Sequence, residues 1–162
     1  MTGKTHVLGG IALGAIYSLN KNLGINETIA VTVISAAGSL LPDIDSSNSK
    51  FGRTIPFVSI PISKIFGHRG LFHWPIFYLI LGALALNFYG QYSFYIYPTL
   101  IGIFSHLILD ILNPLGIPLL SPGSKKVNLL NIYTGSMSEN VLAVIMVIAT
   151  ITVIANNYLN IV

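Results

Sequence analysis

The sequence predicts an all-α membrane protein, a bundle of about five (four to six) spanning helices. Of its 162 residues, 53% are hydrophobic and 8% are charged, whereas about 25% of the residues of an ordinary soluble domain are charged. No Asp, Glu, Lys or Arg occurs in the 40 residues from Gly70 to Leu109 or in the 23 residues from Asn140 to Val162. Because a helix needs about 20 mostly apolar residues to cross the hydrocarbon core, the first stretch has room for two spans and the second for one.

The five expected spans form a single integral-membrane domain over residues 1–162. In order, they cover residues 6–19, 28–41, 73–89, 94–112 and 141–155. The first two are short, so we expect either tilted spans or a hairpin that enters the bilayer only in part. Pro75 suits the first turn of the third span, and Ser136-Met-Ser-Glu139 is a capping box ahead of the fifth. Residues 54–67, apolar with two prolines, are expected to be interfacial or re-entrant, or a linker packed on the bundle.

The basic residues predict the orientation of the chain. With five spans, the N-terminus and the loops 42–72 and 113–140 lie on one side of the membrane, opposite Lys21. Seven basic residues fall on that side: Lys4, Lys50, Arg53, Lys64, Arg69, Lys125 and Lys126. The positive-inside rule then puts the N-terminus and both loops in the cytoplasm and the C-terminus outside the inner membrane. A cleaved signal peptide over residues 1–20 is the alternative, although its apolar stretch is short.

Composition also excludes several classes of protein and partner. The apolar content excludes a disordered chain, and the absence of cysteine excludes a disulfide-stapled module, a zinc ribbon and a thioredoxin-like redox protein. The net charge is +3, but no run of Lys and Arg exceeds two residues. We therefore expect membrane lipid headgroups as partners and no direct contact with nucleic acid. Gly9, Gly14 and Gly38 allow close helix contact within one chain or between two, so the oligomeric state stays open.

The histidines and aspartates predict a metal site at the cytoplasmic face. All of them fall at the expected cytoplasmic ends of spans or in the adjoining loop: His6, Asp43, Asp45, His68, His73, His106 and Asp110. His106 and Asp110 are four residues apart, so they share one helix face, and ionisable groups at this depth usually face the bundle interior. Each of these segments also has a simpler interpretation when it is taken alone. His6 could be an interfacial histidine, residues 42–45 could form a turn, and residues 68–73 could form a loop that contacts lipid.

The ordered motifs of the chain resemble those of a known family. Leu-Leu-Pro-Asp-Ile-Asp-Ser46, His-Arg-Gly70 followed by His73, and the run from Ser105 to Gly116 are similar to three motif blocks of the YdjM-type inner-membrane metal-dependent hydrolases, described as LexA-binding. Thr5-His6 with Gly9-Gly10 resembles their N-terminal block. The resemblance implies a divalent metal centre held by the His and Asp set above, a hydrolytic activity without a named substrate, and a soluble protein partner.

The donor set indicates which metal and which chemistry to expect. Imidazole and carboxylate without thiolate suit one or two divalent ions, Zn²⁺ first and Mn²⁺ or Fe next. Two ions about 3.5 to 4 Å apart would hold a hydroxide nucleophile and polarise a phosphoryl or acyl oxygen. Asp45, Arg69 and His73 are the expected catalytic residues. Either Asp43 or Asp45 would bridge metals or act as base, and Arg69 would contact a phosphate or a developing oxyanion, or else a lipid headgroup.

These features favour a metal-dependent hydrolase that uses a metal-activated water on a phosphoester in a lipid or lipid-linked substrate. A fainter similarity of His106-x-x-x-Asp110 to the zinc-dependent phospholipase C and P1 nuclease group implies the same chemistry by analogy. Two alternatives stay open. A transporter would need polar residues through the full depth of several spans, and the last span offers only Thr150 and Thr152. A non-catalytic anchoring or regulatory protein would hold a structural metal.

Overall fold

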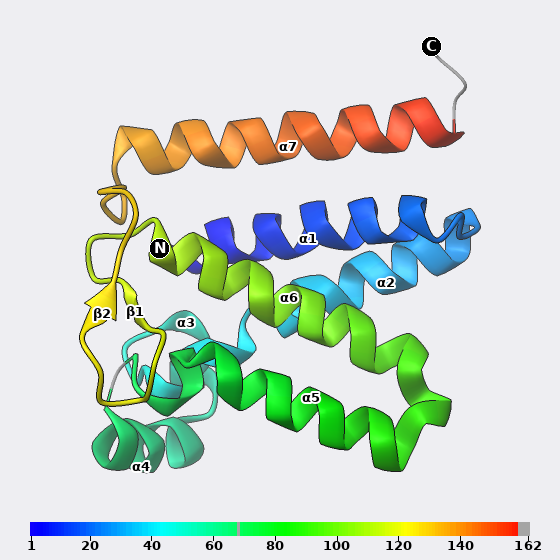
Figure 1. Cartoon of the computed structure of the whole chain (residues 1–162). Helices are drawn as coiled ribbons and strands as arrows, with labels where there is room; N and C mark the ends of the chain where they lie inside the picture. Colours follow the sequence, from blue (N-terminus) through cyan, green and yellow to red (C-terminus); the bar gives the residue numbers. More distant parts are fainter. Residues whose placement is uncertain (68, 159–162) are drawn as a thin grey trace.

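The computed structural model describes residues 1–67 and 69–158 (Figure 1), and these residues form an all-α membrane protein. The long helices are α1 (Gly3–Asn20), α2 (Ile25–Gly38), α5 (Pro75–Tyr89), α6 (Ser93–Ile111) and α7 (Met137–Tyr158). The short elements are η1 (Leu41–Asp45), α3 (Lys50–Thr54), α4 (Pro56–Phe66), η2 (Leu71–His73), η3 (Gly90–Tyr92), β1 (Ile117–Pro118) and β2 (Lys126–Val127). The predicted fold class is confirmed.

Three helices, α1, α2 and α6, pack on one another at the centre of the bundle, with α5 against α6 and α7 against α1 (Figure 1). Small residues make these contacts close. The buried residues of α1 are mostly small: Thr5, His6, Gly9, Gly10, Ala12, Gly14, Ala15 and Ser18. A Cβ on Gly10 would lie 2.7 Å from the carbonyl oxygen of Ser35 in α2, and one on Gly38 would lie 2.5 Å from that of Thr99 in α6. Small residues at such crossings let helix backbones approach, as is typical of membrane helix pairs.

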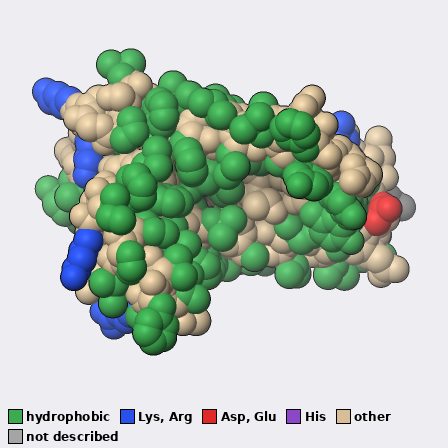
Figure 2. All heavy atoms as spheres, turned by 90° about the horizontal axis from the view of Figure 1, so that it is seen from below, with side chains coloured by type: hydrophobic (Ala, Val, Ile, Leu, Met, Phe, Trp, Pro, Cys, Tyr) green, Lys and Arg blue, Asp and Glu red, His purple; other side chains and the backbone are tan. Residues whose placement is uncertain are grey.

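The outer surface of the bundle is apolar. Residues of α5 and α7 such as Phe88 and Ile151 are exposed, and Figure 2 shows a largely hydrophobic face with Lys and Arg side chains gathered mainly at one end. Among the described residues, three stretches are long and apolar enough to cross a membrane: Ile25–Asp45, Pro75–Ile111 and Met137–Ala155. The second of these contains α5 and α6, which run antiparallel in Figure 1.

Each of the five expected spans falls on a long helix, with ends displaced by at most four residues. Whether all five cross the membrane stays a prediction. The expected loop 42–72 contains η1, α3, α4 and η2. Within it, α4 leaves Phe57 92% and Ile65 73% exposed, which suits a helix at a membrane surface. The expected loop 113–140 carries the two-stranded antiparallel sheet, in which Ile117 pairs with Val127.

The contact between α2 and α6 predicts a cost for a single added methyl group. A Cβ on Gly102 would overlap the carbonyl oxygen of Ser35 and lie 2.7 Å from the backbone nitrogen of Ser39. We expect Gly102→Ala to destabilise the protein by about 1–3 kcal/mol through overpacking, measured as a lower Tm in detergent by circular dichroism. Gly90→Ala is the control, because a Cβ there meets no atom within 4 Å and its φ is −57°. Equal Tm values for the two variants would contradict the close contact.

Candidate metal centre

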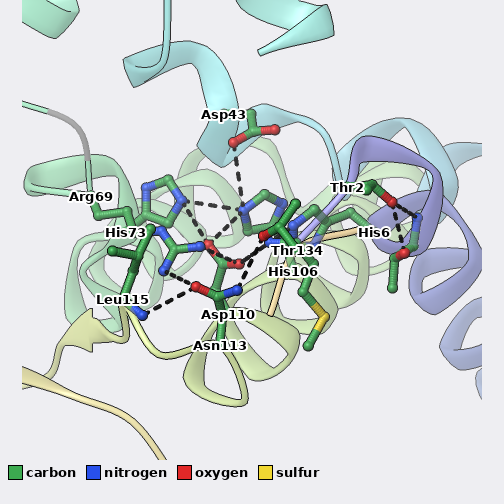
Figure 3. A network of polar contacts seen from close by, with 12 residues as sticks. Thr2, His6, Asp43, Arg69, His73, His106, Asp110, Asn113, Leu115 and Thr134 are labelled. Atoms are coloured by element: carbon green, nitrogen blue, oxygen red, sulfur yellow. Dashed lines mark hydrogen bonds and ion pairs between the residues drawn. The ribbon is translucent and has the colours of Figure 1, made fainter. Parts of the chain in front are cut away.

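The candidate metal centre lies at the end of the bundle where α1 begins and α6 ends (Figure 1), and Figure 3 shows its polar contacts from close by. Of the seven predicted ligands, the structure brings six together: His6 from α1, Asp43 and Asp45 from η1, His73 from η2, and His106 and Asp110 from α6. The seventh, His68, lies outside the described residues. Arg69, the residue after it, joins the same cluster.

Asp110 is the central residue of the cluster and is 1% exposed. Its Oδ2 lies 3.3 Å from His73 Nε2 and 3.5 Å from His106 Nε2. Its other oxygen, Oδ1, lies 2.7 Å from Arg69 Nη2 and 3.5 Å from His6 Nε2. Oδ2 of the carboxylate therefore faces two histidines. Oδ1 faces the guanidinium of Arg69 and a third histidine.

The hydrogen bonds at Nδ1 of two histidines define where their lone pairs point. His73 Nδ1–H donates to Asp45 Oδ2 at 2.9 Å, and His106 Nδ1–H donates to the carbonyl oxygen of Ser39 at 2.7 Å. A neutral imidazole carries one proton, so both Nε2 atoms present lone pairs. These two atoms lie 3.2 Å apart. Two lone pairs that face each other at this distance are unfavourable unless a proton or a cation lies between them.

Three atoms of the cluster fit one divalent ion. The separations among His73 Nε2, His106 Nε2 and Asp110 Oδ2 are 3.2, 3.3 and 3.5 Å. Ligand atoms that share a tetrahedral Zn²⁺ with bonds of about 2.0 to 2.2 Å lie about 3.3 to 3.5 Å apart. The two imidazoles and one carboxylate are also the donor types that this ion prefers. The residues present therefore suit a divalent ion.

Two further side chains lie within reach of this three-atom group. The ring of His6 stacks on that of His106 with centroids 3.6 Å apart, and His6 Nδ1 is buried without a hydrogen-bond partner in the part of the chain that the structure describes. Asp43 Oδ1 lies 4.0 Å from His106 Nε2. His6 with His106 and Asp110, and Asp43 with His73 and His106, each offer ligand atoms within 4.8 Å of one another.

Asp45 lies behind His73, away from the three-atom group. Its Oδ2 also accepts the backbone N–H of Arg69 at 3.1 Å, and the residue is 0% exposed. A carboxylate on the far nitrogen of a histidine orients the ring and raises its basicity as a ligand. The sequence analysis expects Asp45 among the catalytic residues and leaves open whether Asp43 or Asp45 bridges metals or acts as base. The structure gives the two carboxylates different surroundings.

Arg69 is buried and its side chain already has several partners. Its Nη1 donates to Asn113 Oδ1 at 3.3 Å and to the carbonyl oxygen of Gly116 at 3.1 Å, while Nη2 pairs with Asp110. Its φ of 58° lies in the left-handed region, which is unfavourable for a residue with a Cβ and persists only where surrounding contacts hold it. Here the contacts with Asp45 and Asp110 hold it.

A polar cavity of about 220 Å³ opens onto this cluster. Its lining includes Asp43, Arg69, Asp110 and Thr134. The amino group of Met1 also lines it and lies 2.9 Å from Asp110 Oδ1. The centre is thus accessible to a small polar group from one side. Catalytic metal sites keep such an open position, whereas structural sites are closed by protein ligands.

Two contributors to the site were missed by sequence reasoning. The carbonyl oxygen of Ser39, which orients His106, belongs to the C-terminal end of α2, where carbonyl groups lack intrahelical partners. Asn113, just after α6, holds Arg69 and also donates from Nδ2 to the carbonyl oxygen of Ile132 at 3.0 Å. An asparagine before a proline at a helix end was the available signal for the second.

Glu139 links the start of α7 to the start of α1, and so to the helix that carries His6. The predicted capping box forms only in half: Ser136 Oγ accepts the Glu139 N–H at 3.3 Å, but the carboxylate turns away from the Ser136 N–H. Instead, Glu139 accepts the N–H of Gly135 and of Thr2, each at 2.6 Å, and the hydroxyl of Thr5 at 2.7 Å. This correction reflects the tertiary contact between α1 and α7.

We expect Glu139→Ala to destabilise the protein by about 2–4 kcal/mol, because three donors lose their acceptor and the hydrogen bond to Thr5 is buried. Glu27→Ala is the matched control, since Glu27 is exposed and accepts the exposed N–H of Gly24. Thermal unfolding in detergent measures both, and we expect a Tm lower by about 5–10 °C for Glu139→Ala and little change for the control. A Glu139→Ala variant as stable as wild type would show that α7 is held by its apolar contacts alone.

Comparison with known proteins identifies relatives over most of the chain. The family model for the YdjM inner membrane protein matches residues 1–161. The YvsG protein of Bacillus subtilis (strain 168) is 37% identical over 140 residues, which are 86% of this chain and 85% of that protein. The inner membrane protein YdjM of Escherichia coli (strain K12) is 33% identical over 135 residues, 75% of this chain and 66% of that protein. No solved structure matches the chain.

These relatives confirm the resemblance predicted from the motifs, and they support a membrane location. The family match covers both the helical bundle and every residue of the cluster described above. The chain belongs to the YdjM inner membrane protein family.

Proposed function

We propose that this protein is a membrane-embedded, metal-dependent hydrolase that cleaves a phosphoester in a lipid or lipid-linked substrate. One observation carries the proposal: His73, His106 and Asp110 present three ligand atoms 3.2 to 3.5 Å apart, next to a polar cavity. A divalent ion, when bound there, supplies Lewis acidity that polarises a phosphoryl oxygen and activates water.

The surrounding residues have distinct roles in this proposal. Asp45 and the Ser39 carbonyl keep the two imidazoles in the tautomer whose Nε2 can bind an ion. Asp43 is half-buried and lines the polar cavity, so its carboxylate is placed to take a proton from an attacking water or to act as a further ligand. Arg69 holds Asp110 in place and brings a positive charge to the cavity wall, where it would offset the charge of a phosphoester.

The distribution of charge supports an orientation with the centre in the cytoplasm. Lys and Arg side chains gather mainly at one end of the surface in Figure 2, and most basic residues are on the side that the positive-inside rule assigns to the cytoplasm. The cluster belongs to the same end, because Lys4 and His6 lie in the first turns of α1.

The polar residues of α7 argue against a transport path along this helix. Thr150 Oγ1 donates to the carbonyl oxygen of Met146 at 2.8 Å, and Thr152 Oγ1 donates to that of Ile148 at 3.0 Å. Both hydroxyl groups therefore have their hydrogen-bond acceptor within their own helix. A transported ion would need polar groups at successive depths, whereas the described ionisable cluster lies at one end of the bundle.

The first test is the metal content of the detergent-purified protein by elemental mass spectrometry. We expect about one to two equivalents of Zn, Mn or Fe in the wild type and less than about a tenth of that in His106→Ala and Asp110→Asn, because each removes a ligand of the three-atom group. Glu27→Gln, which removes an exposed carboxylate, is the control and keeps its metal. A wild type that neither retains nor takes up a divalent ion would overturn the proposal.

The orienting role of Asp45 predicts a graded loss of affinity. Asp45→Asn keeps the size of the side chain but replaces a carboxylate acceptor with an amide, so we expect metal affinity to fall by about 10- to 100-fold. Competition with a fluorescent chelator measures it in detergent. An affinity equal to that of the wild type would show that the hydrogen bond to His73 does not orient the ring for an ion.

Hydrolysis is tested with the metal-loaded protein on a chromogenic phosphodiester, a phosphomonoester and phosphatidic acid in mixed micelles. We expect turnover of at least one of them, reduced by at least about 100-fold in His106→Ala. Glu27→Gln keeps the wild-type rate. Bound metal without turnover of any phosphoester would favour a structural metal in an anchoring or regulatory protein.

A further inference from the structure

A second, apolar cavity lies beside the polar one. It is a groove of about 560 Å³ between the first two turns of α1, the end of α2 and α3. Val7, Leu8, Leu40 and Phe51 form its walls, with Gly3 and Lys4 toward the start of α1. Its size is within the range of small-molecule sites, about 300–1,000 Å³. The chemistry assigned above to the polar cavity makes no use of it.

The groove lies next to the polar cavity, because Gly3 lines both. A Cβ added to Gly3 would meet no atom of the described residues within 4 Å, so there is free space beside this shared residue. The walls also belong to segments that carry the metal centre. Val7 follows His6, and Leu40 follows Ser39, whose carbonyl oxygen orients His106. A molecule that fills the groove therefore extends toward the candidate metal centre.

The chemistry of the two cavities differs in a way that matches an amphiphile. The groove is walled mostly by hydrocarbon side chains, with Thr54 and the exposed Lys4 also in its lining, whereas the polar cavity has Arg69 in its lining. An extended peptide in the groove would bury backbone N–H and C=O groups against apolar walls without partners, at a cost of several kcal/mol for each group. A hydrocarbon chain has no such groups. The two cations then favour a negatively charged head.

The location of the groove also favours a lipid. It lies at the end of the bundle where α4 exposes Phe57 and Ile65 (Figure 1) and where the Lys and Arg side chains of Figure 2 gather. Exposed apolar side chains next to basic ones are typical of a surface that sits at the headgroup level of a membrane. This location suits a ligand that comes from the membrane.

We propose that this groove binds the hydrocarbon chain of a phosphate-bearing lipid, with the phosphate directed past Gly3 into the polar cavity and Lys4 beside it. The inference rests on the proposed function, since the lipid would be the substrate whose phosphoester meets the metal centre. It specifies the part of the protein that selects a lipid over a water-soluble phosphoester.

The test is photo-crosslinking of the full-length protein in micelles with phosphatidic acid that carries a diazirine on its acyl chain. We expect labelled peptides from residues 3–8 and 40–54. Val7→Trp and Leu8→Trp fill the groove and should each lower this labelling by at least about fivefold. Ile16→Trp, at an exposed position of the same helix, is the control and should label as the wild type does. Metal content shows whether each variant still assembles the histidine cluster.

A second comparison tests the headgroup. Diacylglycerol with the same diazirine chain lacks the phosphate, so we expect it to label these peptides at least about threefold less than phosphatidic acid does. In Lys4→Gln, the difference in labelling between the two lipids should be smaller. Labelling that falls elsewhere in the chain, or that is the same in Val7→Trp, Leu8→Trp and wild type, would overturn the proposal that the groove binds the lipid chain. Equal labelling by both lipids would overturn the phosphate assignment.

The outcomes separate this inference from the proposed hydrolase. Groove labelling in a protein that binds no metal would support the lipid site while the hydrolase proposal fails. Metal binding and turnover of a water-soluble phosphoester without groove labelling would support the hydrolase and overturn the lipid site.

Discussion

Asp110 places an ionised carboxylate inside a bundle of apolar helices, and the arrangement of the surrounding segments compensates that charge. A buried charge without a partner costs several kcal/mol. Asp110 has an ion pair with Arg69 at 2.7 Å and contacts three histidines at 3.3 to 3.5 Å. The ion pair draws the segment before η2 against the end of α6, although Arg69 must adopt a left-handed backbone conformation there.

The charges of the cluster remain unequal after this compensation. The side chains of Asp43, Asp45 and Asp110 bring three carboxylates, and Arg69 brings one guanidinium. The amino group of Met1, 2.9 Å from Asp110 Oδ1, adds a second positive charge, so with neutral histidines one negative charge is in excess. This excess and the spacing of the ligand atoms both favour a bound cation.

Close helix packing brings the partners of this cluster within reach. Glycines let α1 and α6 approach α2 so closely that a Cβ on Gly10 or Gly102 would meet the carbonyl oxygen of Ser35. At the same crossing, α2 ends, and its terminal carbonyl groups have no intrahelical partner. One of them, on Ser39, therefore accepts a hydrogen bond from His106 Nδ1–H. Helix termination and helix packing together supply a contact that orients a histidine.

Much of this could be predicted from the sequence, for identifiable reasons. Long stretches without charge locate helices, because burying a charge in a membrane is costly whatever the fold. The pair His106 and Asp110 follows from helical periodicity alone. The separate roles of Asp43 and Asp45 could not be predicted, since they depend on how η1 turns, with one carboxylate directed at His106 and the other at His73.

Tertiary contacts explain the remaining differences. The motif that begins at Ser136 predicts a local capping box, but Glu139 finds better partners at the start of α1, which are 137 and 134 residues away. Local patterns cannot rank a neighbouring N–H against a distant one. For the same reason, the sequence indicates that Arg69 is near the cluster but not that its guanidinium is already bound to Asp110, Asn113 and Gly116.

The position of the cluster, at one end of the bundle, bears on the proposed catalysis more than the types of residue in it do. A metal that served only to hold helices together would be as effective in the middle of the bundle, and protein ligands would close it off. Here the three-atom group lies at one end, beside a polar cavity of about 220 Å³ that shares Gly3 with an apolar groove of about 560 Å³. The proposed cleavage of a lipid phosphoester needs water in the first and a lipid chain in the second, so their closeness is what the proposal requires.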